Sequence, residues 1–507
     1  MLTQRQLEKI ADEFGKRMEK IVQQYLQAIG EHIRDIGKLL PSDVQKLVEM
    51  KRMGINVDTI KREIAAAMEA ASRDVERVFY ETAETDYRAA QSLFGEARSV
   101  PLRKNAALMR TLKAYTRQTM ETLTNLSNTT VVSTAYRAAI DRAVQAAQSG
   151  VTDYASAVRQ ALKEAATDGL RVQYASGVTR RLDSAVHMNV LDGIRQLNQD
   201  ITIQTGKEYG ADGVELSAHR LCAEDHLPYQ GRQFSNKEFQ RLQALLERPI
   251  GMWNCRHFAF PIILGVSEPA HSQELLENYR RSSQERITID GVTKTRYEWT
   301  QQQRKLETAV RRQKDIANTA KAAGDDVLRR EAQYKIERYQ AAYDRITNKA
   351  LLTADRGRMR VSGFSSVKAA DDETMRILRI ERQRKTRLAN KPSLALPGAD
   401  KATAAEAKFT KYLFNPEKPD GYAKGVAFES RLGYNIKNWE QLRKAILEAA
   451  KLYPASVKSQ SPYGTKYEQK IILHGLKGTP ANVKLGWITD KDGTHLTTAF
   501  IEEVDDE

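Results

Sequence analysis

The residues best suited to chemistry in this 507-residue chain are its two cysteines and two of its eight histidines. Cys222 and His226 are separated by three residues and Cys255 and His257 by one, with 28 residues between the two pairs. Thiolate and imidazole are the ligands of tetrahedral structural zinc, so these four residues are candidate zinc ligands. Cys255 and His257 can face one ion only if their segment is extended, because alternate residues of an extended chain project to the same side.

Two other interpretations of the same residues stay open. The spacing matches no standard zinc finger, and cysteines also pack as small buried thiols while histidines bond to the backbone. A disulfide between Cys222 and Cys255 is the third interpretation, which a reducing compartment disfavours. We expect such a compartment because the first residues, MLTQRQLEKIADEFGKRMEK, carry charges throughout and lack the apolar core of a secretory signal.

Recognisable catalytic motifs are missing from the sequence. It contains no nucleophile elbow, phosphate-binding P-loop, zincin motif or dinucleotide-binding glycine pattern, so the first 390 residues predict no enzyme. Phosphodiester chemistry needs a proton shuttle and a cation that faces the phosphate. The last hundred residues supply candidates for both roles: Lys424, Lys466, His474, His495 and Thr498.

The net charge of +15 favours anionic partners, and its distribution is uneven. Between Arg296 and Lys391 there are 24 Lys and Arg against 13 Asp and Glu, a net +11. This zone is open to three interpretations: a solvated helical face with internal pairs such as Glu307–Arg311 and Glu331–Lys335, a docking surface for an acidic protein, or a non-specific DNA-contacting arm. The few aromatic residues there disfavour sequence-specific reading of nucleic acid.

Long helices must position these residues. Apolar side chains recur every three or four residues from Leu7 to Ile36 and again from Val57 to Leu93, which predicts two long amphipathic helices, and shorter ones follow over 103–125 and 131–148. Glycines and the β-prone Ile201–Ile203 mark a loop-rich module around the cysteines. No run of about 18 uncharged apolar residues predicts a membrane span.

We therefore expect a mainly α protein, with long helices around a compact α+β central module and a small α+β domain at the C-terminus. The predicted regions are a long-helix assembly region (1–150), the compact module with the Cys/His cluster (151–290), a basic helical region (291–390), a linker (391–399) and the α+β domain (400–507). In the last region an amphipathic helix over 436–452 precedes strands over 467–473, 482–489 and 496–501.

Several separated motifs resemble the phage minor capsid proteins related to Mu-type head morphogenesis proteins. They are Arg180–Val186 with Asn189, Val190, Arg195 and Gln196; His226–Arg232 with Phe234 and Ser235; Arg248–Gly251; Asn254–His257; Pro261–Gly265; and Tyr297–Thr300 with Arg304–Glu307. The resemblance covers about residues 1–365. It implies a virion component at the portal vertex, assembled in the host cytoplasm and needed for a DNA-filled head. Its implied partners are portal, capsid and scaffold proteins, and Arg180 and Arg181 are candidate binding residues.

The C-terminal region resembles a small polymorphic-toxin domain of the barnase and colicin-like ribonuclease type. The resemblance rests on Asp400–Lys401, Tyr412–Pro416, Pro419–Gly421, Lys424, Phe428, Leu432–Tyr434, Trp439, Tyr463–Gly464, Lys466–Tyr467, Trp487 and Thr498–Ala499. It implies an effector that cleaves host RNA without a metal. His474 stands where the resemblance leads us to expect a small or apolar residue, so Lys424, Lys466 and Thr498 are the candidate catalytic, phosphate-contacting residues.

Overall fold

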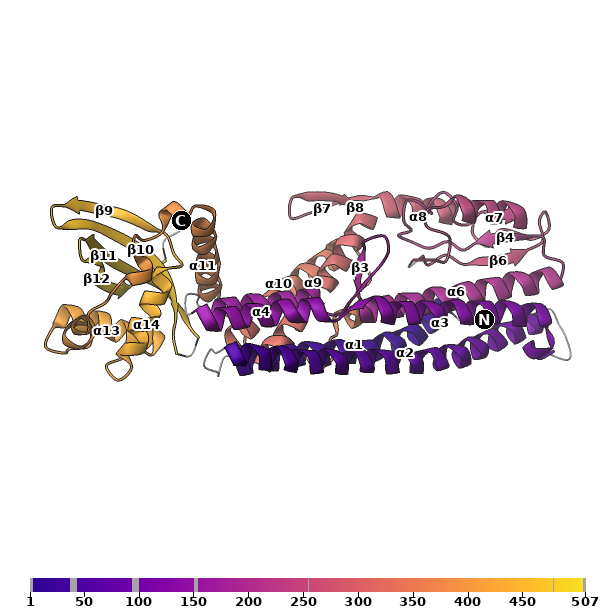
Figure 1. Ribbon diagram of the computed structural model, residues 1–507. Coiled ribbons are helices and arrows are strands. Elements are labelled where there is room, and N and C mark those ends of the chain that lie inside the picture. The colour runs from indigo at the N-terminus through magenta and orange to yellow at the C-terminus, as the bar shows by residue number, and fades with distance from the viewer. Residues whose placement is uncertain are drawn as a thin grey trace.

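The computed structural model describes residues 3–36, 43–93, 100–149, 154–253, 255–476 and 478–504, and shows an elongated molecule (Figure 1). Its long axis follows six helices: α1 (Gln4–Ile36), α2 (Asp43–Leu93), α3 (Ala106–Thr129), α4 (Ser133–Ser149), α5 (Tyr154–Asp168) and α6 (Leu182–Glu208). At 1.5 Å per residue, the 51-residue α2 is about 76 Å long. The apolar stripes predicted from the sequence form one continuous core along this helical body.

The helical body is completed by a helical hairpin and a small sheet. The hairpin comprises α9 (Arg296–Ala323) and α10 (Asp326–Lys349), and α9 lies along α1. Thr295 and Glu298 form a capping box at the start of α9. Gly324, whose φ of 74° is left-handed, ends the helix and allows the chain to reverse. The sheet has the order β1-β2-β3, from β1 (Thr130–Val131), β2 (Arg171–Gln173) and β3 (Thr179–Arg181).

A compact module lies beside α6, toward one end of the body (Figure 1). Its three-stranded antiparallel sheet has the order β5-β4-β6, from β4 (Gly213–Leu216), β5 (Gln233–Ser235) and β6 (Ala259–Ile262). Helices α7 (Asn236–Leu245) and α8 (Gln273–Gln284) follow β5 and β6, and a hairpin of β7 (Arg286–Ile289) and β8 (Val292–Thr295) leads into α9. Short strands and turns therefore hold the segments that contain the two cysteines.

The C-terminal domain lies at the opposite end of the molecule (Figure 1). Its antiparallel sheet has the order β12-β11-β10-β9, from β9 (Ala455–Ser461), β10 (Gly464–His474), β11 (Pro480–Asp490) and β12 (Gly493–Ile501). Three longer helices accompany it: α11 (Asp372–Asn390), α13 (Pro419–Leu432) and α14 (Trp439–Ala450), with the short α12 (Glu406–Lys408) before α13. This architecture confirms the predicted fold class.

The core of the C-terminal domain begins earlier in the chain than the predicted domain. Ile377 and Ile380 of α11, a helix that the sequence placed in the basic region, are buried in this core, and so is Leu396 of the predicted linker. Apolar side chains on one face of a basic helix explain the difference, since the net charge of a segment says little about what its buried face contacts.

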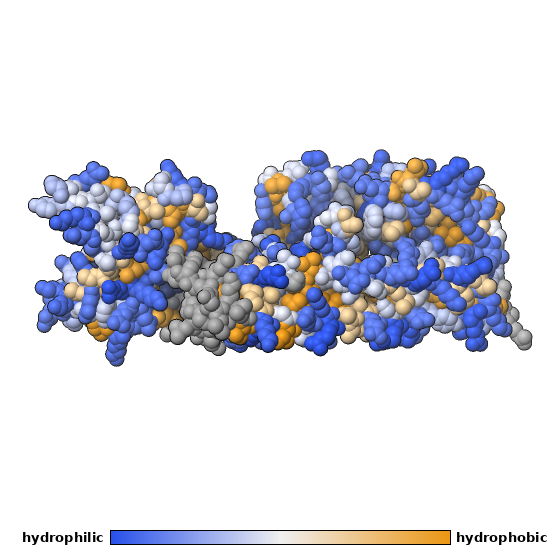
Figure 2. Space-filling view, in the orientation of Figure 1, coloured by the Kyte–Doolittle hydropathy of each residue, from blue (hydrophilic) through white to orange (hydrophobic). Residues whose placement is uncertain are grey.

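No described helix has an apolar stretch long enough to cross a membrane. The visible face of the molecule is largely hydrophilic, with smaller hydrophobic patches spread along the helical body (Figure 2).

Candidate functional site

The sheet of the compact module brings the four predicted zinc ligands together. Cys222 and His226 lie in the loop that leaves β4 and returns to β5, while Cys255 and His257 lie just before β6. Because β6 pairs with β4 in antiparallel register, the segment before β6 runs beside the loop that follows β4. All four side chains are buried. Asn254, adjacent to Cys255, lies outside the described residues.

The distances within this cluster are short. Cys255 Sγ lies 3.3 Å from His226 Nδ1 and 3.4 Å from His257 Nδ1. Cys222 Sγ lies 3.5 Å from His257 Nε2, so the His257 ring stands between the two sulfur atoms. The thiols and rings form two groups of potential metal ligands that share His257. The four candidate residues therefore lie close together, and proximity alone does not separate a metal site from packed thiols.

His219 is a fifth member of the cluster that the sequence analysis missed. Its ring packs on the His257 ring with the centroids 4.5 Å apart, and it joins Cys222 and His257 in one of the two groups. Its Nδ1 donates to the Arg220 carbonyl oxygen at 3.0 Å, whereas its buried Nε2 has no hydrogen-bond partner among the described residues. The sequence could have indicated His219 as a cluster member through its position, three residues before Cys222.

Hydrogen bonds fix the protonated nitrogen of two rings. The Nε2–H of His226 donates to the Arg248 carbonyl oxygen at 2.7 Å, which leaves Nδ1 unprotonated toward Cys255. The side-chain oxygen of Gln230 accepts from the backbone N–H of His219 at 3.2 Å and lies 3.3 Å from His257 Nε2. This oxygen makes Nε2 of His257 a donor, so Nδ1 of both rings presents a lone pair to Cys255.

Burial keeps the cluster electrically neutral in the absence of a cation. Burial, and secondarily the neighbouring Cys255, raises the pKa of the Cys222 thiol to about 12. Burial likewise raises the pKa of Cys255, and it lowers the pKa of His257 to about 3. The two cysteines are free thiols in the structure, so the disulfide interpretation, which the sequence already disfavoured, gains no support.

Two non-glycine residues beside the cysteines adopt left-handed backbone conformations. Leu221, directly before Cys222, has φ of 60°, and Trp253, two residues before Cys255, has φ of 50°. Such conformations cost free energy and persist where the surroundings fix them. One fixing contact comes from α6, whose Arg195 donates to the Cys255 carbonyl oxygen at 3.1 Å.

The two candidate binding residues occupy different environments. Arg180 is exposed. Arg181 pairs with Asp183 at 3.0 Å and also with Asp315 of α9. Burial opposes ionisation of Asp183, but Arg181 and Arg311 outweigh it and lower the pKa of Asp183 to about 2. The Arg181 guanidinium therefore joins the start of α6 to α9, and Arg180 is the one of the two that is free to meet another molecule.

The candidate residues of the tail share part of one surface. Lys466 of β10 pairs with Ile488 of β11, and Thr498 of β12 pairs with Gly486 of β11. Residues 486 and 488 project to the same face, so Lys466 and Thr498 lie on one face of the sheet on either side of β11. Lys424 of α13 lies beside the edge strand β12, with its Nζ 5.6 Å from the Phe500 ring centroid.

Both tail histidines are engaged in contacts within the chain. His474 Nε2 lies 3.0 Å from a carboxylate oxygen of Glu381, and its Nδ1 lies 3.4 Å from the Arg159 guanidinium of α5. His495 Nδ1 lies 2.8 Å from the Thr403 hydroxyl oxygen. His474 thus helps to hold the tail against α11 and the helical body.

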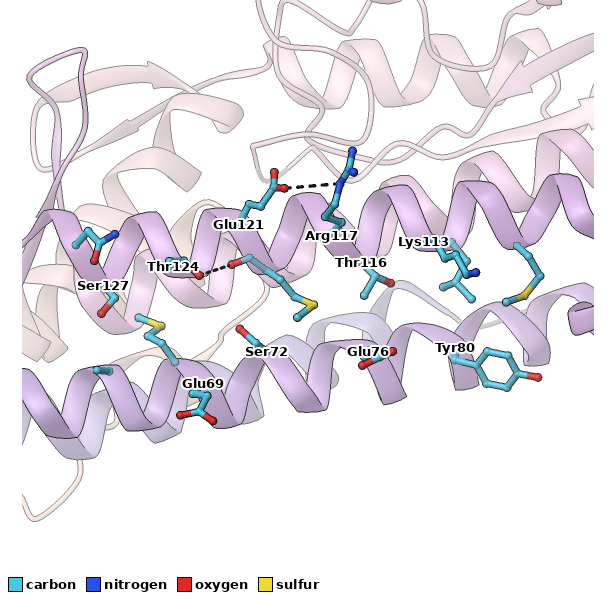
Figure 3. Close-up of a pocket in the computed structure, with 16 residues that line it drawn as sticks. Glu69, Ser72, Glu76, Tyr80, Lys113, Thr116, Arg117, Glu121, Thr124 and Ser127 are labelled. Carbon is cyan, nitrogen blue, oxygen red and sulfur yellow. Dashed lines mark hydrogen bonds and ion pairs between the residues drawn. The ribbon is translucent and has the colours of Figure 1, made fainter.

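A groove of about 860 Å³ runs between α2 and α3 (Figure 3). Methionine and leucine side chains form its apolar part, and charged side chains of both helices border it. The lining residues include Met68, Met109, Leu112 and Met120, with Glu69, Glu76, Lys113, Arg117 and Glu121 at the borders. The groove follows about 16 residues of α2, from Ala65 to Tyr80, or about 24 Å of helix.

Comparison with known proteins identifies the family of this chain. Residues 2–346 match the family model of phage minor capsid protein 2. The chain belongs to this family. As a member, this minor capsid protein is a structural component of a phage head and of the virion.

The match covers the helical body, the compact module, α9 and most of α10. A second match places residues 395–503 of the minor capsid protein in a domain of unknown function (DUF6883). No curated protein and no solved structure matches the chain. The Cys/His cluster and the groove therefore belong to the capsid-family portion, and the candidate phosphate-contacting residues lie in the separate C-terminal domain.

Proposed function

We propose that this protein sits at the portal vertex, where its helical body binds other head proteins during assembly in the host cytoplasm. Membership of the minor capsid family supports a role among head proteins. The groove between α2 and α3 supports the mode of contact, because an apolar channel bordered by charges on an elongated body suits a helix of a partner (Figure 3).

The borders of the groove indicate what the partner helix carries. Glu69 and Glu76 lie on the α2 side, whereas the α3 side carries Lys113, Arg117 and Glu121. Arg117 lies 3.6 Å from the Glu121 carboxylate, so Lys113 is the charge that makes this side net basic. A partner helix complements both borders if it has an apolar stripe between a basic edge and an acidic edge. The occupant we propose is such an amphipathic helix of the portal protein, lying along the groove for about four turns.

The experiment is co-purification of the full chain with the portal protein of the same phage. Met120→Glu places a charge in the groove without emptying the bundle core, and we expect at least a tenfold loss of portal affinity, or about 1.4 kcal/mol. Ala114→Glu, on the exposed side of α3 and outside the groove, is the matched control and should bind normally. Equal binding of the two variants contradicts the groove, and absence of the protein from purified virions contradicts the location.

For the C-terminal domain we propose an effector that cleaves host RNA. The supporting observation is that Lys466 and Thr498 share one face of the sheet while Lys424 lies at its edge, an arrangement in which cationic and hydroxyl groups can contact a phosphate. Neither histidine lies free on that face, so the lysines and the hydroxyl are the residues that we assign to the phosphate.

The test uses the full chain in an RNA-cleavage assay with chelator present. We expect the double variant Lys424→Ala and Lys466→Ala to lower cleavage at least a hundredfold, in line with the loss of charge stabilisation at a phosphate. Lys458→Ala, an exposed lysine on β9 of the same sheet, is the control. Full activity of the double variant overturns the residue assignment, and wild-type protein without any cleavage overturns the effector proposal.

A further inference from the structure

We propose that the Cys/His cluster of the compact module is a structural zinc site, with Cys222, His226, Cys255 and His257 as its four ligands and His219 packed outside them. The inference concerns the core of the capsid-family portion and is independent of portal docking and of the tail. It selects one of the three interpretations that the sequence left open, on observations that the sequence did not contain.

The first observation is the separation of the ligand atoms. For zinc–sulfur bonds of about 2.3 Å and zinc–nitrogen bonds of about 2.0 Å, tetrahedral geometry places a sulfur about 3.5 Å from a nitrogen. Cys255 Sγ lies 3.3 Å and 3.4 Å from the Nδ1 atoms of His226 and His257. Both sulfur–nitrogen distances around Cys255 thus fit tetrahedral zinc, and the three ligand atoms all lie within 4.8 Å of one another.

The second observation is that the orientation of both rings is fixed from outside. Zinc-bound histidines usually donate their other ring N–H to a carbonyl or carboxylate oxygen, which turns the unprotonated nitrogen toward the metal. His226 does so through the Arg248 carbonyl and His257 through the side-chain oxygen of Gln230. Packed thiols need no such arrangement, because a neutral ring bonds equally well through either nitrogen.

The fourth ligand comes from the second group of potential ligands, which joins His219 and Cys222 to His257. The Nε2 of His219 has no hydrogen-bond partner among the described residues, so its lone pair is available, and Cys222 offers a sulfur. His219 and Cys222 are therefore the two candidates for the fourth corner.

Charge decides between them. Two thiolates neutralise Zn²⁺, so a site with Cys222 and Cys255 carries no net charge, whereas three histidines and one thiolate leave a buried positive charge. An uncompensated buried charge is strongly unfavourable. Asp225, whose carboxylate lies 3.7 Å from His226 Nε2, is already bonded to Arg248 at 2.7 Å. Cys222 is thus the fourth ligand. Its thiol lies 3.5 Å from Nε2 of His257, so binding requires it to leave the Ala223 carbonyl oxygen, to which it now donates at 3.1 Å, and to turn to the Nδ1 side of the ring.

Four protein ligands close the coordination sphere, so the site is structural and leaves no open position for a substrate. It would cross-link the long loop between β4 and β5 to the segment before β6. That loop has little regular structure of its own, and a metal compensates for the small apolar core of this module.

The experiment measures zinc in the full-length protein, expressed with zinc in the medium and freed of any histidine tag. Elemental analysis after gel filtration should give about one zinc per chain, and chelator should lower the melting temperature. Cys255→Ser and Cys222→Ser should each lose most of the metal. His219→Gln and the control His187→Gln, whose ring pairs with Asp12 outside the cluster, should retain it.

Cobalt substitution of the wild type tests the site without relying on variants, which can fail to fold for other reasons. Co²⁺ should give thiolate-to-metal charge-transfer absorption of two sulfur ligands together with the d–d bands of tetrahedral geometry. Wild-type protein with less than about half an equivalent of zinc and unchanged stability in chelator overturns the site. Zinc retained by Cys222→Ser but lost from His219→Gln overturns the ligand assignment.

Discussion

Glu381 offers a sharp test of how the C-terminal domain is held together. This carboxylate of α11 is 5% exposed and contacts His474 of β10 at 3.0 Å and Lys385 at 2.9 Å. Glu381→Gln keeps the shape of the side chain and removes its charge. Breaking a buried pair by removing one partner costs about 3–5 kcal/mol, and we expect roughly 3 kcal/mol because Lys385 still reaches water. For a domain of this size the loss lowers the melting temperature by roughly 10 °C.

The pH dependence of the same variant has a defined sign. Burial opposes the charge of Glu381, but the contacts with His474 and Lys385 outweigh it and hold the pKa of Glu381 far below its usual range. The unfolded chain takes up this proton near pH 4.5 and the folded chain only at much lower pH, so the stabilisation is present above about pH 4.5 and is lost as the pH falls. The stability gap between wild type and variant should shrink by about 2 kcal/mol from pH 4.5 to 3.

Calorimetry of the full chain, with hydrogen exchange to locate the loss in the tail, measures both effects. Glu417→Gln, an exposed carboxylate of the same domain, is the control and should change stability by less than about 0.5 kcal/mol. A shift of less than about 1 kcal/mol for Glu381→Gln, or a gap that stays constant with pH, refutes the reasoning.

Three further predictions concern the capsid-family portion. Gly30→Leu should destabilise the helical body by roughly 2–3 kcal/mol in thermal unfolding, because even a Cβ would lie 2.6 Å from a backbone oxygen of α9. Gly54→Leu is the control and should not destabilise it, because the space around Gly54 is open. Arg181→Ala should cost about 3–5 kcal/mol in denaturant unfolding by removing a buried partner of Asp315, whereas Arg180→Ala should have little effect. If the basic region contacts DNA through about six phosphates, electrophoretic shifts should show affinity falling on the order of 10³-fold between about 50 and 200 mM salt.

Periodicity predicted the long helices well, and its failures have physical causes. The stripe from Leu7 to Ile36 corresponds to α1, whereas α2 begins at Asp43, well before the predicted Val57. Periodicity predicted the late start because a charged residue, Glu49, occupies a core position in the early part of α2, where it bonds to the buried His32 at 2.6 Å. A buried polar pair interrupts an apolar pattern without interrupting the helix.

Strand prediction failed where local preference and tertiary packing disagree. The β-prone Ile201–Ile203 lies within α6, because Ile201 is fully buried in the helical core, and packing overrides the preference of β-branched residues for strands. β9 was missed for the opposite reason. It is a polar edge strand whose residues are almost all exposed, so it shows no alternation of apolar and polar positions.

The candidate sites show the same limit of sequence reasoning. Glu331 and Lys335, four residues apart on one helix, pair as expected at 2.7 Å. Arg311 instead bonds to Asp183, far away in the chain, rather than to Glu307. Spacing along a helix predicts neighbours on that helix, but it cannot say which distant segment competes for a long side chain. His219 was missed in the same way, since only the fold brings its ring onto His257.

The boundary of the C-terminal domain leads to a final prediction about how it can be separated from the capsid portion. The family match begins at residue 395, yet Ile377 and Ile380 of α11 are buried in the core of this domain, and Arg384 donates to Asn482 at 2.7 Å. Burial of two isoleucines is worth roughly 3–6 kcal/mol, a large part of the 5–15 kcal/mol that stabilises a typical domain.

A fragment from residue 366 to the end should therefore fold cooperatively. A fragment from residue 395 should expose the face of β10 and β11 that α11 contacts, and it should aggregate or melt at a much lower temperature. Circular dichroism and light scattering of the two fragments measure this, and Ile380→Asp in the longer fragment should reproduce the defect of the shorter one. Equal stability of both fragments would mean that α11 contacts the sheet without stabilising the domain. The functional unit carried behind the capsid portion would then be the matched domain alone, without the helix that joins it to the head protein.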